Sequence, residues 1–214
     1  MTVYLAPHHD DLLLSLPSRL CAGTAGDLGI VVFSEEDDAM RAVCNRLHAA
    51  LGLDIVEMGF VEARRRGVSM RGCLRHERRL ADVAQDPLVD DVLGALDALL
   101  DGNGATAVLA PLLPIHIDHA IVRVAAERLA GTDPAVRLDY YQDQPYAALW
   151  PRTLARETAR MVPGGSGRQA PPGMLERLLD GLRTVVEQRD LDRIAQALRQ
   201  EPCEPLWTGR AGHV

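Results

Sequence analysis

The chain has 214 residues, of which 47% are hydrophobic, and a formal net charge of −7. A chain of this length can bury one sizeable core, so we expect a single domain over residues 1–214. The net negative charge excludes a typical protein that binds the phosphate backbone of nucleic acids. No apolar run is long enough to span a membrane.

Strands and helices are expected to alternate over the first 141 residues. The expected strands are short apolar or β-branched runs: Val3–Ala6, Ile30–Ser34, Asp54–Gly59, Thr106–Pro111 and Arg137–Tyr141. The expected helices have apolar residues at helical spacing: Asp11–Cys21, Ala39–Leu51, Leu88–Leu100 and Ala120–Ala130. This alternation predicts an α/β, Rossmann-like, mostly parallel sheet in the order 3-2-1-4-5, with helices on both faces.

The remaining segments are less regular. Gly52 is expected to end the second helix. Arg64–Arg79 is expected to be a surface loop that runs into a helix. A glycine- and proline-rich flexible segment is expected at 163–173, followed by a C-terminal helix at about 174–198 that packs back onto the domain.

The basic residues and the cysteines narrow the chemistry. All 23 basic residues are arginine, which excludes a lysine Schiff base and a P-loop. The arginine- and alanine-rich composition is typical of GC-rich bacterial genomes. The four cysteines lack paired spacing and are expected to be buried free thiols: Cys21, Cys44, Cys73 and Cys203. With no signal peptide at the N-terminus, we expect a cytoplasmic protein.

Two polar motifs follow two of the expected strands. Pro7–Asp11 (PHHDD) follows the first strand, and Pro114–His119 (PIHIDH) follows the fourth. In the order 3-2-1-4-5 these strands are neighbours and the chain reverses direction between them. Both motifs are therefore expected to meet at the topological switch point, where open α/β sheets bind their ligands.

The spacing within each motif is typical of a metal site. His8 and Asp11 are three residues apart, as are His116 and His119, so each pair can share one face of a first helical turn. Two imidazoles and one carboxylate from such pairs make a three-ligand zinc set with an open position. Helix capping could explain a single such residue, but it explains a cluster of this size less well.

These motifs resemble those of the PIG-L superfamily, also called LmbE-like, which consists of zinc-dependent de-N-acetylases. The family's motifs usually read A/P-H-P-D-D-E and H-P-D-H. Weaker similarity covers Arg41–Gly52 and Tyr141–Tyr146, so the resemblance spans about residues 2–146. It implies hydrolysis of an amide, most often N-acetyl, in a small amino-sugar-like or related conjugate.

Carried over by position, the resemblance implies a role for each motif residue. It implies that Zn²⁺ is the cofactor, with His8, Asp11 and His119 as ligands. It implies that Asp10 is the general base and that His116, as a cation, stabilises the oxyanion and helps to protonate the leaving amine. Asp118 would orient a histidine, and Arg41 is a weaker candidate for substrate contact.

The chain departs from the family pattern at three positions. His9 replaces the usual first-motif proline, Leu12 the usual glutamate, and Ile117 the second-motif proline. His9 adds a possible ligand, and Leu12 removes a possible acceptor. None of the three is an expected metal ligand, but they leave the substrate class and the activity open.

Two other functions remain open from the sequence. Clustered His and Asp residues also suit a metal-dependent phosphoesterase with two metal ions, and the altered motif would also suit a metal-binding pseudoenzyme. Arg64–Arg66 is either a solvated loop or a site for an anionic substrate group. We expect a small-molecule substrate, while the sequence does not indicate the oligomeric state.

Overall fold

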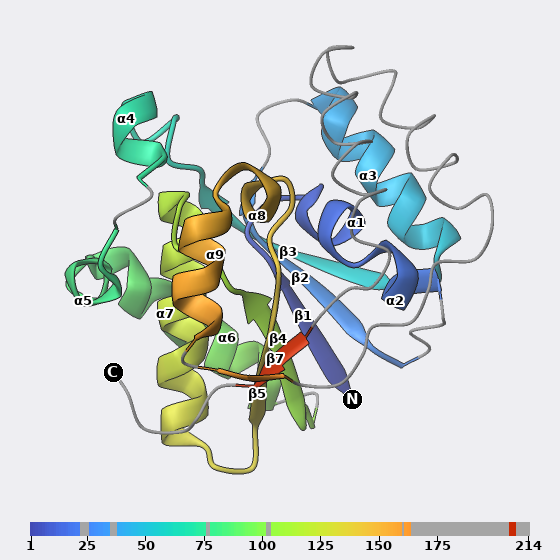
Figure 1. Ribbon diagram of the computed structural model, residues 1–214. Helices are drawn as coiled ribbons and strands as arrows, with labels where there is room; N and C mark the ends of the chain where they lie inside the picture. Colours follow the sequence, from blue (N-terminus) through green and yellow to red (C-terminus); the bar gives the residue numbers. More distant parts are fainter. Residues whose placement is uncertain are drawn as a thin grey trace.

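A mostly parallel sheet organises the protein (Figure 1). The structure is a computed structural model that describes residues 1–21, 26–34, 38–75, 78–101, 104–159, 161–163 and 206–208. Within these residues the strand order is β3-β2-β1-β4-β5-β7-β6. The strands are β1 (Thr2–Ala6), β2 (Leu28–Ser34), β3 (Asp54–Val61), β4 (Ala107–Pro111), β5 (Arg137–Tyr141), β6 (Val162–Pro163) and β7 (Leu206–Thr208).

The five strands expected from the sequence pair in the expected order. Strands β1 to β5 are parallel to one another, so the predicted α/β class and the order 3-2-1-4-5 are confirmed. The sequence did not predict the edge beyond β5, where β7 runs antiparallel to β5 and β6 antiparallel to β7.

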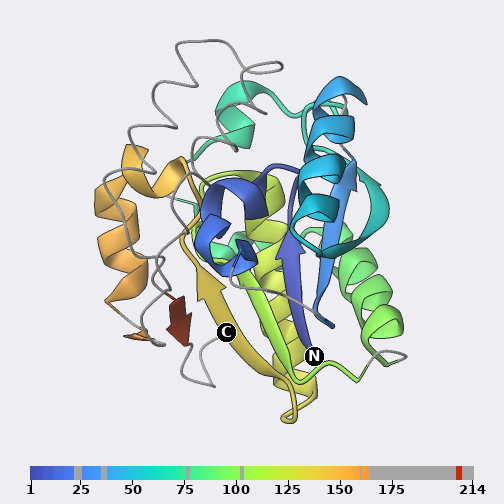
Figure 2. The same cartoon turned by 90° about the vertical axis from the view of Figure 1, so that its right-hand side faces the viewer.

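Helices cover both faces of the sheet, as Figures 1 and 2 show together. They are α1 (Asp11–Ser15), α2 (Pro17–Cys21), α3 (Asp38–Ala50), α4 (Met70–Cys73), α5 (Leu80–Val83), α6 (Pro87–Asp101), α7 (Ile117–Thr132), α8 (Tyr146–Leu149) and α9 (Pro151–Thr158). Within the described part of the chain, no helix is long and apolar enough to cross a bilayer.

The core has two layers, one on each side of the sheet. Strand side chains alternate between faces, so Val3 and Leu5 join the cluster formed with α6 and α7, whereas Tyr4 and Ala6 join the cluster formed with α1 to α3. All four are buried. A central strand covered on both faces explains why β1 is continuously apolar.

Several expected boundaries differ from the structure for local reasons. The helix expected over Asp11–Cys21 is divided in two, because Leu16 leaves the helical conformation before Pro17. Gly52 does follow the end of α3, with φ of +72°. Of the expected flexible segment, Pro163 lies in β6, and the rest of it lies outside the described residues, as does the expected C-terminal helix.

The segment after β3 is mainly turns and two short helices. Ser69 caps α4 by accepting a hydrogen bond from the Gly72 amide at 3.2 Å. Leu74 then forms an isolated antiparallel bridge with His116. This bridge fixes the segment Arg64–Arg79 against the loop that precedes α7.

Candidate metal centre

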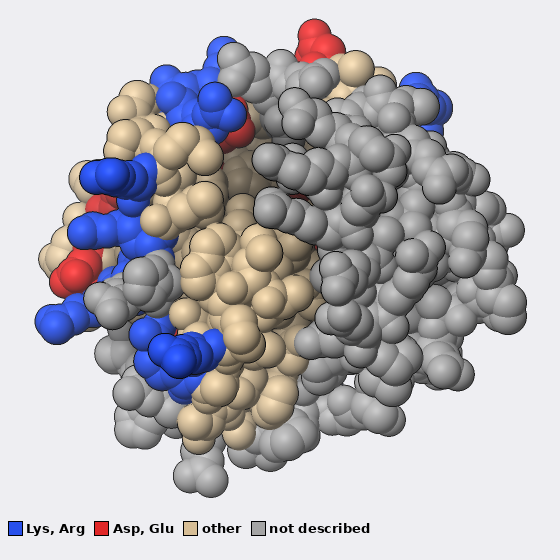
Figure 3. All heavy atoms as spheres, turned by 45° about the horizontal axis from the view of Figure 1, so that its top comes forward, with Lys and Arg blue, Asp and Glu red and all other residues tan. Residues whose placement is uncertain are grey.

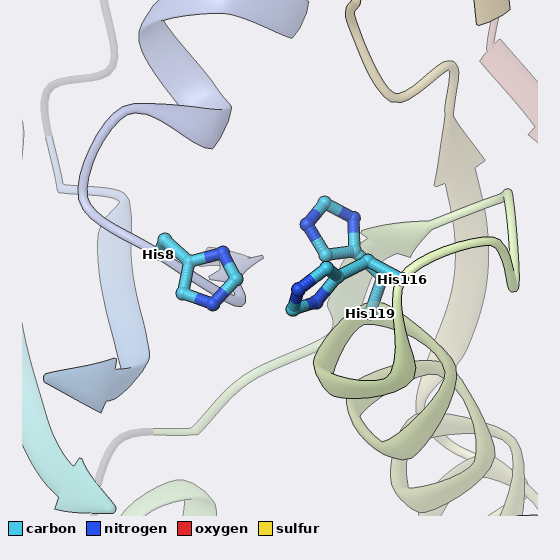
Figure 4. Close-up of side chains that lie close together, drawn as sticks. All are labelled: His8, His116 and His119. Carbon is cyan, nitrogen blue, oxygen red and sulfur yellow. The ribbon is translucent and has the colours of Figure 1, made fainter. Parts of the chain in front are cut away.

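Three histidines converge at the point where β1 and β4 end (Figure 4). His8 lies in the loop between β1 and α1, while His116 and His119 lie at the start of α7. One ring nitrogen of each lies within 4.8 Å of the others. Since β1 pairs with both β2 and β4, the two motifs meet at the topological switch point, as the sequence predicts.

Asp11 bridges two of these histidines. Its Oδ2 lies 3.5 Å from His8 Nδ1, and its Oδ1 lies 3.3 Å from His119 Nε2. Ligand atoms about 2.0–2.1 Å from a tetrahedral zinc lie about 3.3 Å from each other. The two distances from Asp11 therefore match the spacing of ligands around zinc, while the described residues whose ligand atoms all lie within 4.8 Å of one another are His8, His116 and His119.

A further observation concerns His119, which is fully buried. Among the described residues its Nε2 makes no hydrogen bond, although Asp11 Oδ1 lies 3.3 Å away. A metal ion between these two atoms would satisfy both of them. Two imidazole nitrogens and a carboxylate oxygen are thus suitable ligands for a divalent cation of borderline softness such as zinc.

The other nitrogen of each histidine contacts a carboxylate. His8 Nε2 lies 3.1 Å from Asp118 Oδ2, and His119 Nδ1 lies 2.6 Å from Asp143 Oδ1. Carboxylates in this position fix the tautomer and orientation of metal-binding histidines. The arrangement leaves His8 Nδ1 and His119 Nε2 facing Asp11.

Both supporting carboxylates are themselves held in place. Asp118 accepts hydrogen bonds from the Ala63 amide at 2.9 Å and from Arg66 Nη2 at 2.8 Å. Asp143 accepts one from the Leu113 amide at 2.7 Å. Burial opposes the charge on Asp118, but the bond to His8 and the nearby donors lower its pKa to about 2.

The carboxylates also raise the pKa values of His8 and His119. Burial lowers the pKa of His8, but Asp11 and Asp118 outweigh it and raise the pKa well above its usual value. Burial is likewise outweighed at His119, where Asp11 and Asp143 raise the pKa. Bound metal would take the place of the protons that these pairs otherwise hold.

His116 behaves differently from the other two histidines. Burial, together with the charges of His119 and His8, lowers its pKa to about 3. This low pKa indicates a neutral ring at pH 7 in the metal-free chain, and the cation that the family resemblance implies for the reaction stays a prediction. His116 Nδ1 accepts a hydrogen bond from the Asp118 amide at 3.3 Å and so caps α7. Because Nδ1 is the acceptor, the proton of the neutral ring lies on Nε2.

A cavity of about 170 Å³ opens beside these side chains. It is lined by His8, Asp10, Asp11, Leu14, Glu62, Arg64, His116, Gln144, Pro145 and Tyr146. Tyr146 packs edge-on against His119, with 5.1 Å between ring centroids. Asp10 thus lines the same cavity as His8 and Asp11, which is where a general base must lie.

The structure brings most of the expected site residues together, with one exception. Arg41 lies on α3, pairs with Asp38 at 2.6 Å, and does not line the cavity. His9 points away from the cavity and is fully buried, with Nε2 3.2 Å from Glu57 Oε1. Leu12 is buried in the apolar cluster beside α3.

Sequence reasoning did not assign a role to Asp143. It lies in Tyr141–Tyr146, the segment that follows the fifth strand, and so at the same edge of the sheet as the two motifs. An acid directly after the strand next to β4 was the available signal.

Comparisons with known proteins agree on the fold. No family model and no curated protein matches the sequence. Among solved structures, a deacetylase of teicoplanin biosynthesis is similar at 18% identity, with a TM-score of 0.67 over 96% of both chains. A zinc-inhibited teicoplanin deacetylase has a TM-score of 0.64 and 18% sequence identity, and the match covers 96% of both chains. The A40926 pseudoaglycone deacetylase gives 0.64 at 17%, over 100% of this chain and 98% of the other.

Proposed function

We propose that the chain is a zinc-dependent hydrolase that cleaves an amide bond, preferably that of an N-acetyl group, in a small amino-sugar-like or related conjugate. The spacing of Asp11 between His8 and His119 carries this proposal. The motif resemblance and the deacetylase names of proteins with the same fold support it.

Zinc, held by His8, Asp11 and His119, would supply a Lewis acid that polarises the amide carbonyl and makes water more acidic. Asp10 lies on the cavity wall and accepts a proton from the attacking water. Attack on the carbonyl carbon gives a tetrahedral oxyanion. Breakage of the C–N bond then releases a carboxylate and a free amine, which takes up the proton.

The neutral state of His116 suits it to bind the oxyanion. With Nδ1 engaged at the start of α7, its Nε2–H is available as a hydrogen-bond donor. A neutral donor fixed before the reaction begins stabilises developing charge without a proton transfer. Asp118 and Asp143 act through His8 and His119 and do not touch the substrate.

The test is to replace Asp10 in protein reconstituted with one zinc per chain. Acetate release from a panel of N-acetylated amino sugars is measured for wild type, Asp10→Asn and the control Asp91→Asn, an exposed position on α6. We expect Asp10→Asn to lower kcat by about 10²–10⁴ with zinc content unchanged. Unchanged turnover in Asp10→Asn contradicts the role of Asp10.

Two further measurements separate the alternative functions. Two metal ions per chain in protein loaded with excess metal, together with phosphate release from phosphate esters, would favour the phosphoesterase. Bound zinc without hydrolysis of any N-acyl compound would favour the pseudoenzyme.

A further inference from the structure

A strongly basic segment borders the cavity of this acidic protein. Arg64–Arg79, here called the arginine segment, contains seven arginines, while the whole chain has a net charge of −7. Figure 3 shows basic side chains gathered mainly on the side of the molecule where α4 and α5 lie. Such a concentration of like charge raises the question of what each arginine binds.

Two of the seven arginines stabilise the local structure. Arg66 binds Asp118 at 2.8 Å and the Val61 carbonyl at 2.6 Å, with its guanidinium 5.2 Å from the centre of the Phe33 ring. Arg78 donates to the carbonyls of Gly72 and Cys73 at 2.6 and 3.0 Å. These two side chains therefore stabilise the backbone of the arginine segment.

The other five arginines have no such structural role. They are exposed, and none forms an ion pair with a carboxylate in the described part of the chain: Arg64, Arg65, Arg71, Arg75 and Arg79. Like charges held close together are unfavourable when ion pairs do not offset them, which favours binding of an anion by the segment.

Backbone contacts fix the arginine segment to the candidate metal centre. The Arg75 amide donates to the Ile115 carbonyl at 2.9 Å, next to the bridge between Leu74 and His116. On the other side, the Ala63 amide binds Asp118 at 2.9 Å. The adjacent residue, Arg64, lines the cavity together with Asp10 and His116.

We infer that the substrate carries an anionic group, a phosphate or a carboxylate, that Arg64 binds at the rim of the cavity. A guanidinium makes paired, charge-assisted hydrogen bonds with either group, and the exposed arginines around it add to the field. The inference rests on the proposed function and specifies its substrate class.

The test measures equilibrium binding, which does not require turnover. Zinc-loaded protein is titrated calorimetrically with glucosamine, glucosamine 6-phosphate, glucosamine 1-phosphate and the carboxylate-bearing muramic acid. We expect at least one anionic sugar to bind about tenfold or more tightly than glucosamine, with the preference weakening as salt is raised. The anion that binds most tightly identifies phosphate or carboxylate as the group.

Arg64→Gln is then compared with Arg46→Gln, which removes the same charge from an exposed position on α3 outside the cavity. We expect Arg64→Gln to abolish most of the preference and Arg46→Gln to retain it. The inference is wrong if no anionic sugar binds more tightly than glucosamine. It is also wrong if Arg64→Gln keeps the preference, which would place the anion on a group other than Arg64.

Failure of the proposed function gives a different result. An Arg64-dependent preference without acetate release from any N-acetyl compound contradicts the hydrolase and supports the anionic ligand. Acetate release without a charge preference supports the hydrolase and contradicts the anionic ligand.

Discussion

Asp118 and Asp143 hold the two candidate histidine ligands in the same way, although they come from different elements. Each carboxylate binds one histidine nitrogen and one backbone amide, those of Ala63 and Leu113. The amide fixes the carboxylate, and the carboxylate fixes the ring. The nitrogens that would face a metal are thereby oriented in advance.

This support can be tested at Asp143. Asp143→Asn keeps an oxygen for the Leu113 amide but removes the charge beside His119, so we expect zinc affinity to fall about 10- to 100-fold. The measurement is zinc competition with a chromophoric chelator, with circular dichroism to check the fold. Asp139→Asn, at a buried acid on β5 that contacts Thr208 and Arg137, is the matched control. Equal zinc affinity in wild type and Asp143→Asn would contradict this role.

The sequence revealed the residues whose chemistry is local and not those that act across the fold. His8 and Asp11, like His116 and His119, lie within one helical turn of each other, so their spacing was informative. Asp143 is 24 residues from His119 and acts only because β5 lies beside β4. The neutral state of His116 depends on its burial, which its spacing does not reveal.

At the scale of the elements, glycines at two positions should respond in opposite ways to a methyl group. Gly52 ends α3 with φ of +72°, which strains any other residue, so Gly52→Ala should destabilise the fold by about 1 kcal/mol. Gly94 lies inside α6 with open space where the methyl group of an alanine would lie, so Gly94→Ala should stabilise it by about 0.5–1 kcal/mol. Urea unfolding measures both, and changes of the same sign would contradict the argument.

The packing of α3 against the sheet predicts a dependence of stability on pH. His48 on α3 is fully buried, and burial with the nearby charge of His9 lowers its pKa to about 4. Between about pH 6.5 and pH 4 the unfolded chain takes up a proton that the folded chain does not. The free energy of unfolding should therefore fall as pH falls, by about 2 kcal/mol from this residue at pH 5.

His48→Leu isolates this contribution. Neither ring nitrogen of His48 bonds to any residue that the structure describes, so leucine removes no hydrogen bond there. In metal-free protein, urea unfolding at pH 7.5 and pH 5 should show a smaller loss of stability in His48→Leu than in wild type. An identical loss in both proteins would show that His48 is not the group responsible.

The elements that the sequence predicted are those with a strong local signal. Five strands and four helices had apolar runs or helical spacing, and the structure contains them with shifted ends and with the first helix divided in two. Strand β7 has only three residues and forms because β5 offers an edge 65 residues earlier in the chain, which no local pattern reveals. The short helices α4 and α5 both contact α7, which lies far from them in the sequence.

Across the whole molecule, the candidate metal centre joins the two halves of the sheet. His8 and Asp11 follow β1, at the start of the half formed with β2 and β3, whereas His119 follows β4 in the other half. A metal held by these residues closes a loop of more than a hundred residues. It binds the folded chain only, because the unfolded chain does not keep the ligands together.

Zinc should therefore raise the thermal stability of the entire chain. Free zinc at about 100 times its dissociation constant adds about 2.7 kcal/mol, which corresponds to an increase in Tm of about 5–10 °C for a protein of this size. Asp11→Asn should lose most of this increase, whereas His116→Asn should keep it, since asparagine still caps α7 and the site retains His8, Asp11 and His119. Scanning calorimetry with zinc and with chelator measures the shift in each protein. Loss of the shift in His116→Asn but not in Asp11→Asn would instead assign the three histidines as the ligands.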